Sequence, residues 1–387
     1  MTATEQRHGF GLYVHWPYCA RICPYCDFNV YAAKARDTAP LLEAICADIR
    51  AHRRVFPELE DPLDSVFLGG GTPSLLEPRD MAAIIEAAHA TFGLRQDAEI
   101  TLEANPGDVV AADLTAWRAA GVNRLSIGVQ SLDDEALAFL GRDHDAACAR
   151  TAVERALSAF PSVSIDLIYA RPGQSPHDWQ RELRDALALG APHLSLYELT
   201  IAERTVFEKR VQRGELVPMP DDDQAALYEL TQDVTEAAGL PAYEISNHAA
   251  GAWHRSVHNM VYWQAGDWIG VGPGAHGRLS TRQGRIASLA HRRPEEYAAA
   301  AASGAPAWAT QDVLSAIDTA REALAMGLRV DAGVDLARIE TLAGRALDAG
   351  ALARMQALGL ISRDAGRVRL TREGRLLADR VSAEISP

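Results

Sequence analysis

Short runs of β-branched and aromatic residues alternate with longer stretches of helical periodicity over the first half of the chain. The amphipathic, alanine-rich stretches include 113–120 and 177–189, which end at Gly121 and Gly190. The short runs have the length and composition of buried strands, and they lie at residues 11–16, 65–68, 99–103, 124–130, 162–169 and 193–199. The pattern predicts a repeated β-α unit with six strands.

Polar residues gather where these predicted strands end. The second run leads into the glycines 69–71, the third ends at Glu103 and the fourth at Gln130. Parallel strands joined by crossover helices can form an open doubly wound sheet or a TIM-type barrel, and barrels build their sites at the carboxyl ends of the strands. The polar strand ends therefore favour an α/β fold with a partial (β/α)6 TIM-type barrel over residues 1–239.

The β-α rhythm fades beyond this segment. Residues 253–277 are rich in glycine, histidine and aromatic residues, which predicts a loop-built lid or extension over 240–305. Helical patterns resume after it, with a hairpin at 359–362 and 367–371, which predicts a helical, winged-helix-like domain over 306–387. Residues 311–387 contain as many acidic residues as arginines, so this domain lacks the basic face of a DNA-reading module.

Composition narrows the class of protein. The 387 residues are 48% hydrophobic, enough for one large core and an appended domain. The net charge of -14 disfavours nucleic acid and anionic membranes as partners. Residues 1–10 lack the apolar core of a secretion signal, and no apolar run is long enough to span a bilayer. We expect a cytoplasmic protein whose membrane contact is at most peripheral.

Three of the five cysteines, Cys19, Cys23 and Cys26, lie within eight residues. They are too few and too clustered for a disulfide framework, which points to a metal or redox role. Three thiolates on one loop can hold a [4Fe-4S] cluster whose fourth iron stays open to a small ligand. A structural zinc site with His15 as fourth ligand, or a disulfide with a spare thiol, are the alternatives. Cys46 and Cys148 stand alone in helical stretches and are expected to be small buried hydrophobes.

The spacing C-x3-C-x2-C, with Tyr25 before the third cysteine, resembles the signature of the radical S-adenosylmethionine (SAM) superfamily. Most of the chain is similar to the oxygen-independent coproporphyrinogen III oxidase branch, through G-G-G-T-P at 69–73, E-A-N-P at 103–106, G-V-Q-S at 128–131 and D-L-I-Y at 166–169. The resemblance implies a radical SAM barrel with SAM on the open iron. It also implies that SAM is contacted by the matching residues Tyr13, Tyr25, Gly70, Gly71, Thr72, Glu103, Gln130, Arg142 and Asp166.

The chemistry of these residues suits the implied roles. Glycine permits a close approach of backbone to ligand, and carboxylates such as Glu103 and Asp166 can accept hydrogen bonds from ribose hydroxyls or amino groups. Arg142 can bind a carboxylate through two hydrogen bonds, although an arginine at a helix end is also an ordinary solvated charge. The branch usually continues D-L-I-Y with G-L-P-G-Q, whereas this chain has Ala170 and Arg171 before the P-G-Q, so we expect the turn there to differ.

Two functional classes of this branch are compatible with the chain. One is an oxygen-independent coproporphyrinogen III dehydrogenase, which oxidatively decarboxylates its substrate by radical SAM chemistry; the other is a heme chaperone, which binds heme and passes it to hemoproteins. The dehydrogenases continue with Cys-x-Cys and carry a longer N-terminal extension, whereas here Asp27 and Phe28 follow Cys26 and eighteen residues precede Cys19.

The segment H-N-x-x-Y-W at residues 258–263 matches the heme-chaperone group, and imidazole is a common axial ligand of heme iron. The resemblance therefore favours a heme chaperone that binds heme through His258, with an electron donor for the cluster and recipient hemoproteins as partners. His248, His254 and His276 are the alternative ligands, and a radical SAM enzyme for another small substrate remains the third possibility.

Overall fold

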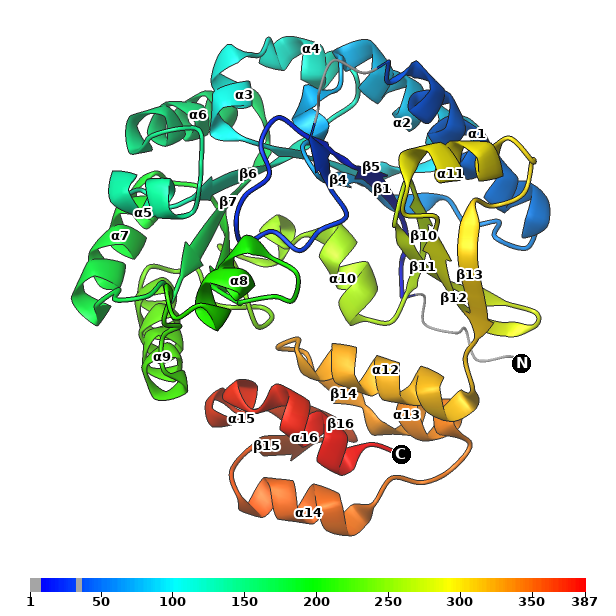
Figure 1. The fold of residues 1–387 in the computed structure, drawn as a ribbon. Coiled ribbons are helices and arrows are strands. Elements are labelled where there is room, and N and C mark those ends of the chain that lie inside the picture. The colour runs from blue at the N-terminus through cyan, green and yellow to red at the C-terminus, as the bar shows by residue number, and fades with distance from the viewer. Residues whose placement is uncertain (1–7, 33–36) are drawn as a thin grey trace.

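The computed structural model of the protein describes residues 8–32 and 37–387, and its main body is a curved sheet of eleven strands wrapped by helices (Figure 1). Six strands pair in parallel in chain order: β1 (Phe10–Trp16), β4 (Leu63–Gly70), β5 (Leu94–Ala104), β6 (Arg124–Gln130), β7 (Ser162–Tyr169) and β8 (His193–Glu198). All six predicted strands are present. The predicted α/β fold with a partial barrel is confirmed.

Helices cover the outer face of this sheet. In chain order they are α1 (Ala39–Val55), α2 (Pro78–Phe92), α3 (Pro106–Ala111), α4 (Leu114–Ala119), α5 (Asp134–Phe139), α6 (Ala146–Ala159), α7 (Pro176–Ala188) and α9 (Asp221–Ala237). The short α8 (Val206–Gln212) instead packs beside the cysteine loop, where the amide of Phe207 donates to the carbonyl oxygen of Pro24 at 3.0 Å. The start of α7 shows how the sequence fixes a boundary. The Ser175 side chain accepts a hydrogen bond from the amide of Asp178, and Pro176 fills the first turn, where no amide partner is needed.

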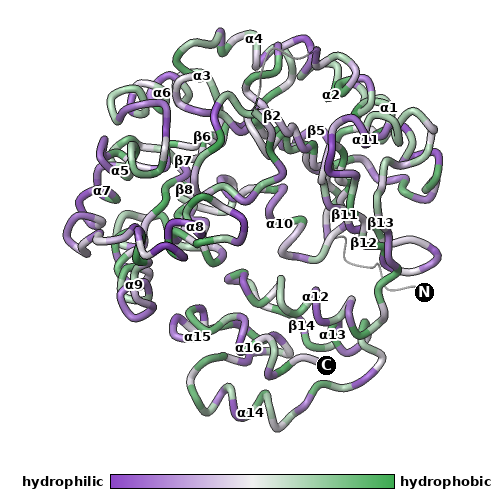
Figure 2. The backbone as a smooth tube through the Cα atoms, in the orientation of Figure 1, coloured by the Kyte–Doolittle hydropathy of each residue, from purple (hydrophilic) through white to green (hydrophobic). Residues whose placement is uncertain are grey.

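The burial of the helices and strands follows the hydrophobic pattern. Along α7, Trp179, Leu183 and Ala186 are buried at helical spacing, so one face of the helix packs on the sheet while the other stays hydrophilic (Figure 2). The parallel strands are buried on both faces, as in β1, where only Tyr13 is half-buried. This is why they appear in the sequence as continuous apolar runs rather than alternating ones.

The segment after α9 extends the sheet at both ends. β9 (Asn247–Ala249) pairs antiparallel with β8, and after α10 (Val257–Trp263) the strand β10 (Asp267–Val271) pairs in parallel with β1. An antiparallel series follows, formed by β11 (His276–Thr281), β12 (Gly284–Ala290) and, after α11 (Pro294–Ala301), β13 (Trp308–Val313).

The expectation that residues 253–277 are built from loops is therefore wrong. Their glycines serve close backbone packing instead. A Cβ atom on Gly270 would lie 2.1 Å from the carbonyl oxygen of His276, and one on Gly272 would lie 2.2 Å from the carbonyl oxygen of His15. Glycine within a strand commonly marks such an approach, and composition alone does not distinguish it from a loop.

The C-terminal part has a core of its own. It contains α12 (Ala316–Leu328), β14 (Val334–Asp335), α13 (Leu336–Ala343), α14 (Ala349–Ala357), β15 (Ile361–Asp364), β16 (Arg367–Leu370), α15 (Arg372–Leu376) and α16 (Ala378–Ile385). The predicted hairpin is present as β15 and β16, which pair antiparallel, and the helices with the three-stranded sheet form the expected winged-helix-like arrangement. β13 still belongs to the main sheet, so the separate core begins with α12.

The C-terminal unit faces α10 across the opening of the curved sheet (Figure 1). An ion pair of 2.6 Å between Nη2 of Arg255 and Oδ2 of Asp331 joins the two parts. In residues 8–32 and 37–387, no helix combines the length and apolarity that crossing a membrane requires. The prediction about a secretion signal concerns residues 1–10, of which 1–7 lie outside the described residues.

Candidate metal and cofactor site

Two cavities lie at the carboxyl ends of the parallel strands. The smaller has a volume of about 420 Å³ and the larger about 760 Å³. Cys26, Asp27, Phe28 and Ala202 line both cavities, so the loop after β1 separates them. This location is the one that a barrel architecture predicts for a functional site.

The cysteine loop crosses the open centre of the curved sheet (Figure 1). Two short strands hold its ends together, because β2 (Tyr18–Cys19) pairs in parallel with β3 (Tyr31–Ala32). Cys19 is buried, Cys23 and Cys26 are half-buried, and all three line the smaller cavity. The structure thus brings the three predicted metal ligands to one cavity.

Burial raises the pKa of the Cys19 thiol and raises that of Cys26 to about 11. In the metal-free protein these groups are therefore neutral near pH 7, and metal binding releases their protons. The loop offers three soft sulfur donors, and the cavity beside it is large enough for a small ligand. This arrangement fits a [4Fe-4S] cluster with an open iron.

The zinc alternative has less support. Both ring nitrogens of His15 are already engaged, Nδ1 with the Tyr13 hydroxyl at 2.9 Å and Nε2 with the Asn29 carbonyl oxygen at 3.0 Å. His15 is therefore not available as a fourth ligand in this conformation.

Two half-buried carboxyl groups also line the smaller cavity. Glu103, at the end of β5, accepts a hydrogen bond of 2.9 Å from the amide of Gly70. Asp166, within β7, accepts one of 2.9 Å from the hydroxyl of Ser126. Burial raises the pKa of both groups, that of Glu103 to about 8. Buried carboxyls are costly unless they are paired, so both suit the hydroxyl and amino groups of a polar ligand.

Replacing Glu103 by Gln should reduce the pH dependence of stability in the cluster-free protein. The folded state holds the Glu103 proton more tightly than the unfolded state, so wild-type stability falls as pH rises from about 4.5 to about 8. At about 1.4 kcal/mol per pKa unit, the loss in wild type is on the order of 3–5 kcal/mol. Urea unfolding at ~pH 5 and ~pH 9 measures it, with the exposed Glu86→Gln as control. Equal pH dependence in Glu103→Gln and wild type would contradict this assignment.

The glycine run at the end of β4 is required by the protein's own packing. Gly70 has φ +105°, and a Cβ atom there would lie 2.6 Å from the His15 ring. The amide of Gly71 donates to the carbonyl oxygen of Trp16 at 2.7 Å, and that of Thr72 to the carbonyl oxygen of Tyr18 at 2.8 Å. These residues line the smaller cavity as predicted, but their amides are already used, so a ligand there would meet their carbonyl and side-chain groups.

The remaining predicted SAM contacts, with one exception, converge on the same cavity. Arg142 donates from Nη1 to the sulfur of Cys23 at 3.3 Å and from Nη2 to the carbonyl oxygen of Gly128 at 3.0 Å. Gln130 adopts φ +66° where the pairing of β6 with β7 shifts register, a strained conformation of the kind that concentrates at functional sites. Tyr25 and Arg142 also line this cavity.

Sequence reasoning missed several residues of this cavity, among them the polar Asn105 and Ser126. Asn105 accepts a hydrogen bond from Arg142 and donates one of 3.5 Å to the Thr72 hydroxyl, while Ser126 binds Asp166. Asn105 lies in the E-A-N-P segment, and Ser126 is a polar residue inside an apolar strand. Both features could have identified these positions as candidate site residues from the sequence.

The sequence of this chain is similar to those of several known proteins. A Bacillus subtilis protein named heme chaperone HemW is 34% identical over 375 residues, covering 95% of this chain and 97% of the relative. A Mycobacterium tuberculosis protein of the same name is 36% identical over 382 residues, covering 96% and 93%. The Radical SAM superfamily profile matches residues 13–186 and the HemN C-terminal domain profile matches 314–377. The chain belongs to the radical SAM superfamily.

Other relatives carry a more general name. A Bos taurus protein called radical S-adenosyl methionine domain-containing protein 1, mitochondrial, is 41% identical over 332 residues, covering 84% of this chain and 74% of the relative. The structure of coproporphyrinogen III oxidase (HemN) from Escherichia coli, a radical SAM enzyme, aligns with TM-score 0.79 at 21% identity, covering 98% and 90% of the two chains. This likeness confirms the fold. Membership of the superfamily implies SAM and a [4Fe-4S] cluster as cofactors.

Two residues of this radical SAM protein lie elsewhere than the sequence suggested. Tyr13, expected to contact SAM, lines the larger cavity and not the smaller one. His258, expected to bind heme, lines neither cavity. Its Nδ1 bonds to the hydroxyl of Ser65 at 2.8 Å and its Nε2 to that of Tyr262 at 2.6 Å. Its geometry does not support a role as heme ligand, because both ring nitrogens are engaged inside the protein.

The unusual Arg171 has a structural role in this radical SAM protein. Its Nη2 lies 2.6 Å from Oε2 of Glu182 on α7, and its Nη1 donates to the carbonyl oxygen of Ile168 at 3.0 Å. Both side chains are buried. Ala170 before it adopts φ +57°, in the left-handed region that glycine favours, at the position where the usual pattern has glycine. Arg171 lines neither cavity, and its bonds to Glu182 and Ile168 fix the loop that follows β7.

Proposed function

We propose that this protein is a heme chaperone, which binds heme and delivers it to hemoproteins while carrying a SAM-ligated [4Fe-4S] cluster. The similarity over nearly the whole length to the bacterial relatives named heme chaperone HemW carries this proposal. The larger cavity supports it, because its volume of about 760 Å³ lies within the range of sites for small molecules and cofactors.

Cys19, Cys23 and Cys26 would hold the cluster, which supplies one-electron chemistry to SAM when it is bound. The chain's own residues orient the ligand. Glu103 and Asp166 would accept hydrogen bonds from its hydroxyl and amino groups, while Gln130 offers both a donor and an acceptor. Arg142 provides a half-buried positive charge beside Cys23.

The proposal includes the environment and partners of the protein. We place it in the cytoplasm, with an electron donor for the cluster and recipient hemoproteins as partners. The net charge of -14 argues against nucleic acid as a partner, because a phosphate backbone would be repelled. Any contact with a membrane is at most peripheral.

The competing function is that of an oxygen-independent coproporphyrinogen III dehydrogenase. The structure of HemN supports this alternative through the shared fold alone. Against it, Asp27 and Phe28 follow Cys26 and line the boundary between the two cavities, at the positions where the dehydrogenases continue with Cys-x-Cys.

Anaerobically reconstituted protein should bind heme stably and pass it to an apo-hemoprotein. The same sample should form no protoporphyrinogen from coproporphyrinogen III when SAM and a reductant are present. Heme binding and transfer are followed by visible absorbance, and the tetrapyrrole products by chromatography. Appearance of protoporphyrinogen would assign the enzymatic function, and failure to bind heme would leave a radical SAM enzyme for another small substrate.

A further inference from the structure

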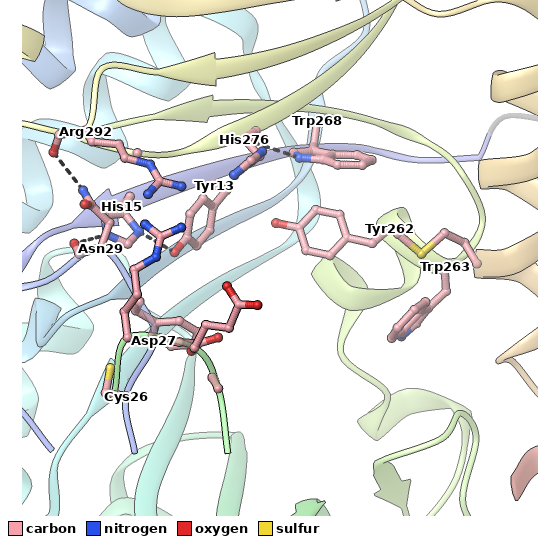
Figure 3. Close-up of a pocket in the computed structure, with 16 residues that line it drawn as sticks. Tyr13, His15, Cys26, Asp27, Asn29, Tyr262, Trp263, Trp268, His276 and Arg292 are labelled. Carbon is pink, nitrogen blue, oxygen red and sulfur yellow. Dashed lines mark hydrogen bonds between the residues drawn. The ribbon is translucent and has the colours of Figure 1, made fainter. Parts of the chain in front are cut away.

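The larger cavity combines an apolar, aromatic wall with a few charged groups. Its aromatic side chains come from separate elements, Tyr13 from β1, Tyr262 and Trp263 from α10, and Trp268 from β10 (Figure 3). Met326 from α12 closes one side, so the C-terminal unit contributes to the cavity. Such a wall suits a flat apolar ring system, because aromatic faces bury large areas with little loss of conformational freedom.

His276, at the start of β11, is the histidine of this cavity whose ring is free. Within residues 8–32 and 37–387 no hydrogen bond engages its imidazole, although its carbonyl oxygen accepts one of 3.0 Å from Trp268. Partial burial and the nearby Arg278 and Arg292 lower the pKa of His276, which keeps the ring neutral near pH 7, the form that binds metals. Of the other histidines considered as heme ligands, His248 and His254 line neither cavity.

Two arginines line the same cavity. Arg204 comes from the loop after β8 and Arg292 from the loop after β12. Neither guanidinium has a hydrogen bond or ion pair within the described residues, while the backbone of each is held in place. Arg292 accepts hydrogen bonds at its carbonyl oxygen from the Asn29 side chain at 2.8 Å and from Tyr31 at 3.1 Å. Asp27 and Glu203 also line the cavity, so binding of an anion there depends on these two arginines.

In the H-N-x-x-Y-W segment, the histidine contacts the cavity only through the aromatic residues that follow it. His258 is buried on α10, where its ring stacks on Phe67 at 5.0 Å and holds the Tyr262 hydroxyl at 2.6 Å. Its amide donates to Oε1 of Glu99 at 3.0 Å. Tyr262 and Trp263 at the end of the same helix line the cavity. The histidine therefore positions the aromatic wall rather than facing the ligand.

We propose that the larger cavity binds heme with His276 as the axial ligand of the iron and with Arg204 and Arg292 as the partners of the two propionates, while His258 is a positioning residue. This inference rests on the proposed function, because it assigns the residues of the heme site. The ligand chemistry is that of a flat metalloporphyrin carrying two carboxylates: a neutral imidazole binds the metal, guanidinium groups bind carboxylates, and aromatic faces cover the ring.

The test is a titration of the cluster-containing full chain with heme, monitored by absorbance and electron paramagnetic resonance. We expect His276→Ala to change the spectrum of the bound heme and to weaken binding at least about tenfold. His177→Ala, on the exposed face of α7, serves as the matched control and should leave both unchanged. His258→Gln should keep the wild-type heme spectrum, because its side chain can still bond to Tyr262.

A second arm tests the arginines. The double variant Arg204→Gln with Arg292→Gln should bind heme at least about tenfold more weakly, yet bind heme dimethyl ester as well as wild type does, because the ester lacks the carboxylates. Arg282→Gln, exposed in the turn between β11 and β12, is the control. Thermal melting and cluster absorbance check that each variant is folded.

The outcomes separate the two proposals. If wild type binds heme and His276→Ala retains both the spectrum and the affinity, the inference about the ligand is overturned and the chaperone proposal stands. If His258→Gln loses the spectrum and His276→Ala keeps it, the iron ligand is His258. If wild type binds no heme at all, the proposed function itself fails.

Discussion

Replacing Cys23 by Ser is expected to abolish binding of the [4Fe-4S] cluster and, with it, the binding site for SAM. Thiolate sulfur is the required donor, and the chain offers only three cysteines at the smaller cavity. Cys23 is half-buried in a loop outside the main core, so the fold should survive the change. Wild type reconstituted under anaerobic conditions should contain about four iron atoms per chain, and the variant almost none.

The matched control for this prediction is Cys148→Ser. Cys148 lies on α6, away from both cavities, and its replacement should leave iron content and visible absorbance unchanged. A variant Cys23→Ser that keeps a full cluster would contradict the assignment of the ligands. Stoichiometric zinc in wild-type protein purified without oxygen would contradict the assignment of the metal.

Replacing Arg171 by Leu should destabilise the protein by about 3–5 kcal/mol, because it leaves Glu182 buried without its ion partner. The side chains of Arg171 and Glu182 are only 9% and 7% exposed, and Glu182 also accepts a hydrogen bond of 2.9 Å from the amide of Leu132. Urea unfolding followed by circular dichroism measures the change.

A second leucine substitution provides the comparison. Arg150 lies 3.2 Å from Asp185 on the surface, where both side chains are about half exposed, so Arg150→Leu should cost less than about 1 kcal/mol. Adding Glu182→Gln to Arg171→Leu should recover part of the lost stability, since the uncompensated charge is then removed. If Arg171→Leu and Arg150→Leu are equally stable, the buried pair does not stabilise the loop after β7.

Much of the site could be predicted because its residues follow from local sequence. The cysteine spacing is complete within one loop, and Glu103 and Gln130 end strands that the apolar runs had already identified. In a parallel barrel the carboxyl ends of neighbouring strands lie at one rim, so residues placed there in the sequence share a cavity. Asp166 was placed by the same reasoning, because a carboxyl inside an apolar strand needs a polar surrounding.

The second cavity could not be predicted in this way. Tyr13 and His276 lie on strands of opposite regions of the chain, and they line one cavity because β10 pairs with β1 and β11 pairs with β10. Arg204 and Met326 reach it from a loop and from the C-terminal unit. No sequence pattern predicts that these residues line one cavity, because none of them belongs to a recognisable motif.

The sequence by itself determined the order of the six parallel strands and the family, and it predicts the cluster ligands, because periodicity, turn residues and short motifs act over a few neighbouring positions. Only the tertiary structure decided which residues line the two cavities. His258 illustrates the difference. Its hydrogen-bond partner Ser65 is 193 residues away in the sequence, and this bond occupies one of the two ring nitrogens of the motif histidine inside the protein. Long-range pairing of strands and side chains decides such roles, since hydrogen-bonding groups that are satisfied inside the protein are no longer available to a ligand.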